Sequence, residues 1–233
     1  MMRVESAGIV RKGGWTAWSA MFAVACLVSV DAMAQRGGGI QISQEKLDEA
    51  WKAQATEVSR GFKLDTEKIA KVVEAYKASR ESQAEQVQEL FSGGQRGPGM
   101  FQEMQEINET ESGILKENLM KFLSEKESET AATSLGSFNR EWDRLVVTVL
   151  GFKLEPEKQT KALELIAGYV VESNKARAEA IAAQDFQSLR TASEELKGML
   201  DMSIASLLSA EQIETWKTET QRRQRGGGGG RRN

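Results

Sequence analysis

The sequence predicts an all-α protein built from tandem long antiparallel helical hairpins, with about seven helices. The composition favours helix, since the 233 residues include only two prolines and 6% aromatic residues and many Glu, Lys, Ala, Gln and Leu. Apolar residues recur every three or four positions through long stretches, which is the spacing of one helix face. An internal repeat indicates that one helical unit occurs twice.

The repeat is clearest in a short turn sequence. The segment 61–68, GFKLDTEK, returns 90 residues later at 151–158 as GFKLEPEK. A second pair, FLSE at 122–125 and LLSA at 207–210, is 85 residues apart. The first copy carries a Gly-rich insertion at 92–99, which accounts for the difference between the two offsets. The chain is therefore interpreted as two helical modules in tandem.

The first 34 residues predict a secretory signal peptide. Arg11 and Lys12 supply positive charge, the apolar run 15–30 follows, and Ala32-Met33-Ala34 has the small-x-small pattern of a signal peptidase site. We expect cleavage after Ala34. Two alternatives remain open, a lipoprotein modified at Cys26 and an uncleaved membrane anchor.

Glycine-rich stretches divide the rest of the chain, because glycine loses much backbone entropy in a helix. The predicted organisation is a signal peptide at 1–34, a flexible Gly-rich start at 35–43, a first helical module at 44–150, a second module at 151–221 and a disordered Arg/Gly tail at 222–233.

The composition excludes several kinds of chemistry. The chain has no histidine, and cleavage removes its single cysteine. The mature protein then lacks the residues on which disulfides, zinc sites and copper sites depend. It also lacks the base of Ser-His and Cys-His catalysis. We expect no enzymatic activity, no cofactor and no metal site, and the acidic helix segments are interpreted as solvated faces because none matches a calcium loop.

The first two predicted helices are 44–59 and 66–91. Trp51 anchors the apolar face of the first helix. The apolar stripe of the second helix is interrupted by a polar gap at Arg80 and Gln83.

The third and fourth predicted helices are 101–122 and 125–149. The fourth has the alternating four- and three-residue spacing of a coiled-coil-like seam, so we expect one continuous helix that links the two modules. Its expected core positions are Ala131, Leu135, Phe138, Trp142, Leu145 and Val149.

The last three predicted helices are 156–183, 186–207 and 210–224. The first of them repeats the apolar pattern of 66–91. The tryptophans expected to anchor the core of the whole protein are Trp51, Trp142 and Trp216.

Two helix starts carry the sequence of a capping box. Ser124 is followed three residues later by Glu127, and Ser209 by Gln212. In such a box the hydroxyl accepts from the backbone amide three residues on, and the longer side chain accepts from the amide of the cap.

Two further helix starts are marked by the repeated turn. Pro156 suits the first position of a helix, which makes Glu155 the predicted cap and Asp65 its equivalent in the first copy. A leucine precedes each of the four caps, at the position of a hydrophobic staple. These leucines are Leu64, Leu123, Leu154 and Leu208.

The four capped turns resemble one motif. The segment 208–212, LSAEQ, has the pattern L-[ST]-x-x-Q, and 64–68, 123–127 and 154–158 are more divergent versions. Two such motifs around a long helical hairpin, behind a secretory signal, resemble the Spy/CpxP (LTXXQ motif) family of periplasmic stress proteins, here as a tandem duplication.

The resemblance implies an all-α, cradle-like or elongated bundle in the periplasm. It further implies a role in envelope stress, either as an ATP-independent chaperone or as a regulator of a sensor kinase. A family dimer combines two hairpins, and this chain carries both, so we expect a monomer or a homodimer.

The resemblance thus implies a protein that holds non-native or partner polypeptides without ATP, and flexible methionine side chains suit that role because they adapt to many shapes. The alternative is a structural or regulatory interaction protein that binds a sensor domain or another envelope protein and has no general chaperone activity. The candidate client-binding residues, for each of which core packing is the competing interpretation, are Met100, Phe101, Met104, Phe186, Leu189, Met199 and Met202.

The tail at 222–233 carries five arginines among its glycines. It is interpreted either as a solvated terminus or as a tether to an anionic surface or an acidic partner. No nucleic-acid partner is expected, because the signal peptide directs the chain away from most nucleic acid.

Overall fold

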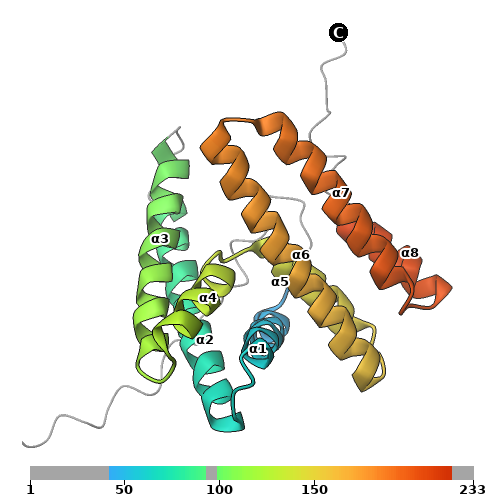
Figure 1. Cartoon of the computed structure of the whole chain (residues 1–233), viewed down its shortest axis with the longest axis horizontal. Helices are drawn as coiled ribbons and strands as arrows, with labels where there is room; N and C mark the ends of the chain where they lie inside the picture. Colours follow the sequence, from blue (N-terminus) through green and yellow to red (C-terminus); the bar gives the residue numbers. More distant parts are fainter. Residues whose placement is uncertain (1–41, 93–98, 222–233) are drawn as a thin grey trace, which may run out of the picture. The chain divides into compact units, whose positions relative to one another are not determined.

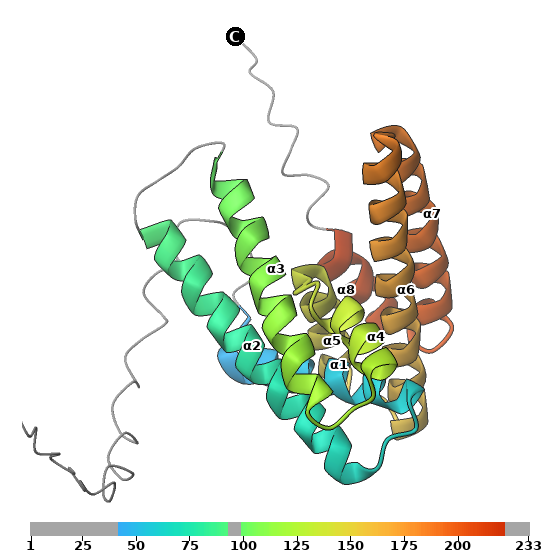
Figure 2. The same cartoon turned by 60° about the vertical axis from the view of Figure 1, so that its left-hand side comes forward.

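The structure is a computed structural model that describes residues 42–92 and 99–221. Within these residues the protein is all-α, as the sequence predicts, with eight helices and no strand. The predicted signal peptide and the Arg/Gly tail lie outside the described residues. The helices in Figures 1 and 2 are α1 (Gln44–Gly61), α2 (Thr66–Ser92), α3 (Gly99–Met120), α4 (Glu125–Leu135), α5 (Arg140–Gly151), α6 (Pro156–Ala183), α7 (Phe186–Ala205) and α8 (Ala210–Gln221).

Two antiparallel hairpins follow the same order along the chain. Helix α3 returns along α2, and α7 returns along α6 (Figures 1 and 2). Helix α1 precedes the first hairpin and α5 precedes the second, and these two helices contact each other. Helix α1 also contacts α2, α4 and α6, whereas α5 contacts α6 and α8. The division into modules at 44–150 and 151–221 stays a prediction.

The repeated Gly-Phe-Lys-Leu sequence forms the same helix-ending turn in both copies. Lys63 follows α1 with a φ of 54°, and Lys153 follows α5 with a φ of 49°. This left-handed region is uncommon for residues other than glycine. In each copy the lysine amide donates to the carbonyl three residues earlier, at 3.0 Å to Arg60 and 3.2 Å to Leu150.

The core is one hydrophobic cluster to which all eight helices contribute buried side chains. Trp51, Trp142 and Trp216 are all buried in it, which confirms their predicted role as anchors. Because α1 and α5 lie against each other, the core is continuous between the two copies of the repeat.

The single helix predicted over 125–149 is wrong, because α4 ends at Leu135 and α5 begins at Arg140. Gly136 follows α4 directly, and its amide donates to the carbonyl of Ala132 at 2.8 Å.

Helix α5 begins at an N-cap of its own, Asn139. The Asn139 side chain accepts hydrogen bonds from the backbone amides of Glu141 and Trp142, at 2.8 and 3.4 Å. Phe138, immediately before it, has a φ of 43°. The apolar spacing concealed this break because all six expected core positions are buried on both sides of it. The glycine and the asparagine cap were the signals that locate it.

Candidate functional site

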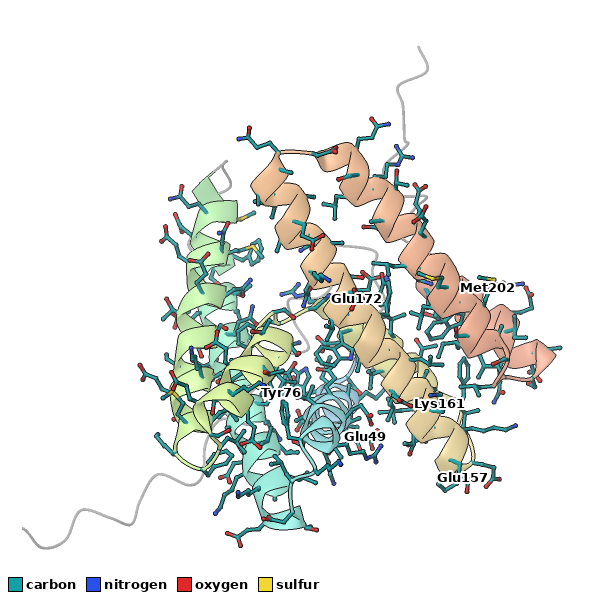
Figure 3. All side chains as sticks on the ribbon, in the orientation of Figure 1. Glu49, Tyr76, Glu157, Lys161, Glu172 and Met202 are labelled. Carbon is teal, nitrogen blue, oxygen red and sulfur yellow. The ribbon has the colours of Figure 1, made fainter. Side chains whose placement is uncertain are left out.

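The predicted client-binding residues differ in exposure. Met199 and Met202 lie three residues apart on α7 and are 53% and 70% exposed. Met202 points to the side of α7 that faces away from α6 (Figure 3). Met100, Met104 and Leu189 are half-buried. Phe101 and Phe186 belong to α3 and α7, but their side chains lie outside the described part of the structure.

Other exposed apolar residues were not predicted as binding residues. Ile114 on α3 is 43% exposed, whereas its neighbour Leu115 is fully buried. The apolar spacing alone could not separate these two residues, because both fit a three-or-four pattern. Phe91, Met120, Val171 and Ile181 are the other large apolar side chains exposed in the described part of the chain.

A buried polar cluster joins α1, α2 and α5. We call it the Arg80 cluster, and it consists of Trp51, Gln54, Tyr76, Arg80 and Asp143, all of which are at most 5% exposed. Arg80 on α2 forms an ion pair with Asp143 on α5. Gln54 on α1 donates to the second carboxylate oxygen of Asp143 at 3.0 Å and accepts from the Tyr76 hydroxyl at 2.7 Å. Tyr76 is labelled in Figure 3, where its side chain extends from α2 towards α1.

Three aromatic rings surround the guanidinium group of Arg80. The Arg80 Cζ lies 5.0 Å from the ring centroid of Trp51, 5.8 Å from that of Phe138 and 6.0 Å from that of Tyr76. At these distances the negative ring faces attract a cation. The rings and Asp143 together offset part of the cost of removing a charged group from water.

The Arg80 cluster leaves some buried donors unused. The Nε and Nη1 atoms of Arg80 and the Nε1 atom of Trp51 have no hydrogen-bond partner in the described part of the chain. Such donors cost free energy when they are buried.

Burial raises the pKa of the Tyr76 hydroxyl above its ordinary value, with Arg80 opposing and Asp143 adding to the effect. Tyr76 therefore stays a neutral donor to Gln54 over the physiological pH range.

A second polar group lies between α2 and α3. Glu111 on α3 is 2% exposed and accepts hydrogen bonds from Ser82 at 2.8 Å and from Gln86. Gln83 donates to Asn108 at 3.0 Å. The polar gap predicted at Arg80 and Gln83 is thus directed into the protein and not towards solvent.

The second copy of the repeat has apolar residues at three of these buried polar positions. The offset of 90 places Ile166 and Val170 at the positions of Tyr76 and Arg80, and both are fully buried. The offset of 85 places Leu196 at the position of Glu111. At these three positions the first copy has buried polar side chains and the second copy has apolar ones.

The capping residues make specific contacts. Ser124 accepts from the Glu127 amide at 3.4 Å, and Glu127 accepts from the Ser124 amide at 2.9 Å. Ser209 and Gln212 exchange the same two bonds, at 3.3 and 2.9 Å. Gln212 also donates to the carbonyl of Phe152 at 3.2 Å, which ties the start of α8 to the repeated turn after α5.

The caps of α2 and α6 differ from each other. Asp65 accepts from the Lys68 amide at 2.8 Å. Glu155 occupies the cap position of α6 ahead of Pro156, but its side chain makes no capping hydrogen bond. The four leucines of the turns all pack on the core, with Leu123 buried and Leu64, Leu154 and Leu208 partly buried.

Within residues 42–92 and 99–221, no group of three or more His, Cys, Asp or Glu side chains is placed to hold a metal ion. In the same segments, none of the helices combines the length and the apolar character needed to cross a membrane.

No known protein family, curated protein or solved structure matches this chain. The resemblance to the Spy/CpxP family, which is carried by the capped turn motifs, therefore stays a prediction.

Proposed function

We propose that this protein is exported to the periplasm and holds non-native or partner polypeptides without ATP. The observation that supports this function best is the pair of exposed methionines on α7, Met199 and Met202. Methionine side chains are flexible and polarisable, so they bind apolar segments of varied shape. The turn motifs that resemble the Spy/CpxP family, and the predicted signal peptide, support the same proposal.

The proposal is tested with the mature chain, residues 35–233, which contains every described helix. The chain is mixed at a near-stoichiometric ratio with a chemically denatured, aggregation-prone protein, and light scattering is followed without ATP. We expect suppressed aggregation that persists when the tail at 222–233 is deleted. The double variant Met199→Ser/Met202→Ser should suppress aggregation less, whereas Val171→Ser, which removes an exposed apolar side chain from α6, should not.

A dedicated interaction protein is the second candidate function. It is favoured by the burial of most predicted apolar positions, including all six of the 125–149 segment. An absence of aggregation suppression would reject the chaperone function and leave this candidate. Crosslinking in the native envelope would then identify one specific partner, such as a sensor domain or another envelope protein.

A further inference from the structure

Helices α3 and α7 share residues that the packing of the protein does not explain. With the offset of 85, α3 and α7 have identical residues at five positions. Leu115 and its equivalent Leu200 are buried in the core, so their identity has a structural cause. The other identical pairs are Phe101 and Phe186, Gln102 and Gln187, Glu109 and Glu194, and Gly113 and Gly198.

Three of these shared pairs face solvent. The glutamine, the glutamate and the glycine are exposed in both helices. Along each helix the glutamate comes seven residues after the glutamine, and the glycine comes four residues after the glutamate. At this spacing the three residues lie along one face of the helix. We call this face the Gln-Glu-Gly stripe, formed by Gln102, Glu109 and Gly113 on α3 and by Gln187, Glu194 and Gly198 on α7.

The glycine of each stripe lowers the stability of its helix. Gly113 and Gly198 lie inside their helices, where glycine is less favourable than alanine. A Cβ atom added at either position would meet nothing within 4 Å. No internal neighbour therefore requires glycine, and yet both copies keep it. A helix that lacks a side chain at one exposed point lets another backbone approach closely at that point.

Apolar side chains border each stripe. Ile114 and Met199 directly follow the two glycines and are 43% and 53% exposed. One turn or two further on, Met120 on α3 and Met202 on α7 are also exposed. Each stripe thus combines one residue without a side chain, the glycine, with exposed apolar surface beside it.

Carboxylates dominate the charge of these faces. The exposed acidic residues on α3 are Glu103, Glu106, Glu109 and Glu117, and α7 exposes Glu194 and Glu195 against Arg190. The shared glutamates make solvent-exposed contacts within their own helices, which a basic group of a bound segment can replace. Glu109 accepts from Gln105 at 2.8 Å, and Glu194 pairs with Arg190 at 3.0 Å.

We propose that the two Gln-Glu-Gly stripes are equivalent docking sites for a polypeptide segment that carries both basic and apolar side chains. The glutamate attracts the basic group, the neighbouring Ile or Met contacts the apolar group, and the glycine allows the segment's backbone to come close. This inference rests on the proposed function and specifies where and by what chemistry a polypeptide is held.

The test uses the mature chain and a fluorescein-labelled synthetic peptide of Lys, Leu and Ala. A matched peptide with Glu at each Lys position controls for charge. Fluorescence anisotropy should show two molecules of the Lys peptide bound per chain and no comparable binding of the Glu peptide. Gly113→Ala alone should weaken one of the two binding events about tenfold or more and leave the other at the wild-type affinity, and Gly113→Ala/Gly198→Ala should weaken both. Glu109→Gln/Glu194→Gln should weaken the binding of the Lys peptide to a similar extent.

The glycine variants separate docking from folding. Alanine is the better helix former, so the double variant should melt higher, by about 2–4 °C for each substitution. Gly168→Ala is the matched control, because Gly168 is an exposed glycine inside α6 with nothing within 4 Å of an added Cβ and with Ala78 at the equivalent position of α2. It should raise the melting temperature and leave peptide binding unchanged.

The outcomes distinguish this inference from the proposed function. A double glycine variant that melts higher and binds the Lys peptide unchanged overturns the inference, as does a wild-type chain that binds neither peptide. Aggregation suppression that persists fully in that variant leaves the proposed function standing without the stripes. Peptide binding at the stripes by a chain that does not suppress aggregation rejects general chaperone activity and keeps the docking sites.

Discussion

Arg80 on α2 and Asp143 on α5 form an ion pair in the interior of the protein, with 5% and 3% exposure. The two residues are 63 positions apart, and they connect the first hairpin to α5, the helix that precedes the second hairpin. Asp143 is also held by Gln54 of α1. The ion pair joins α2 to α5 and the Gln54 amide adds α1, at a place where the second hairpin has Ile166 and Val170 in the positions of Tyr76 and Arg80.

Removal of one partner of this pair should be strongly destabilising. Arg80→Met leaves the Asp143 carboxylate buried with only Gln54 as a donor, and Asp143→Leu leaves a guanidinium group among aromatic rings. We expect either single variant to lose about 3–5 kcal/mol of unfolding free energy, measured by urea denaturation.

The double variant Arg80→Met/Asp143→Leu should recover most of that loss. No unpaired charge then remains in the interior, and the unused donors of Arg80 disappear as well. The coupling free energy from the double-mutant cycle measures the interaction. Losses that simply add in the double variant would show that the two side chains do not depend on each other.

A substitution at Gly136 should disturb the junction between α4 and α5. A Cβ atom at this position would lie against the Ser112 hydroxyl and the Ala132 carbonyl, with the Ser112 Cβ at 2.9 Å. We expect Gly136→Ala to cost about 1–3 kcal/mol, because helix α3 must move to make room. Thermal melting followed by circular dichroism is a suitable measurement. Gly136→Ala/Ser112→Gly should recover only part of the lost stability, since it removes the Ser112 side chain but leaves the contact with the Ala132 carbonyl.

The two tyrosines of the chain, Tyr76 and Tyr169, should both resist ionisation in the folded state. Burial raises the pKa of Tyr169 to about 12, with the nearby Glu141 adding to the effect, and it raises the pKa of Tyr76 further. A spectrophotometric titration of the native protein should show little tyrosinate at pH 10.5, whereas the unfolded chain should ionise near pH 10.

The same pKa values fix the sign of the stability change at alkaline pH. The unfolded chain releases its tyrosine protons first, so unfolding becomes easier as the pH rises from about 10 towards 12. Below pH 10 neither tyrosine contributes a pH dependence. Native tyrosinate absorbance that rises near pH 10 would show that these hydroxyls are open to water.

The parts of the fold that could be predicted from sequence are those set by local interactions. The caps at Ser124 and Ser209 depend on residues three positions away, and the repeated turn depends on four consecutive residues. The tryptophans could be placed in the core because large apolar side chains gain most from burial.

The parts that could not be predicted depend on distant residues. Arg80 was recognised only as a polar gap, since nothing local shows that Asp143 lies opposite it. Ile114 and Leu115 are equally apolar neighbours, and only the packing of α3 against α2 and α4 decides which of them is buried. The helix break at 136–139 is a different case, because Gly136 and the Asn139 cap mark it locally, but the apolar spacing that continues through it concealed them.

The largely buried Glu57 on α1 should make stability fall as the pH rises above its ordinary pKa. Burial raises the pKa of Glu57, Arg60 lowers it, and the nearby Glu164 of α6 raises it. The folded protein therefore holds this proton at a pH where the unfolded chain has released it. Between pH 4.5 and the raised value, unfolding free energy should fall with increasing pH, and it should then level off.

Glu57→Gln removes this effect because the amide carries no titrating proton. The difference in urea midpoint between wild type and variant should shift in favour of the variant as the pH is raised from 4 to 7. Glu164→Gln should remove part of the same shift, since it deletes the negative charge that disfavours ionisation of Glu57. A difference that stays constant over this pH range would mean that Glu57 titrates alike in the folded and unfolded chains, and the contact between α1 and α6 would then place no electrostatic strain on it.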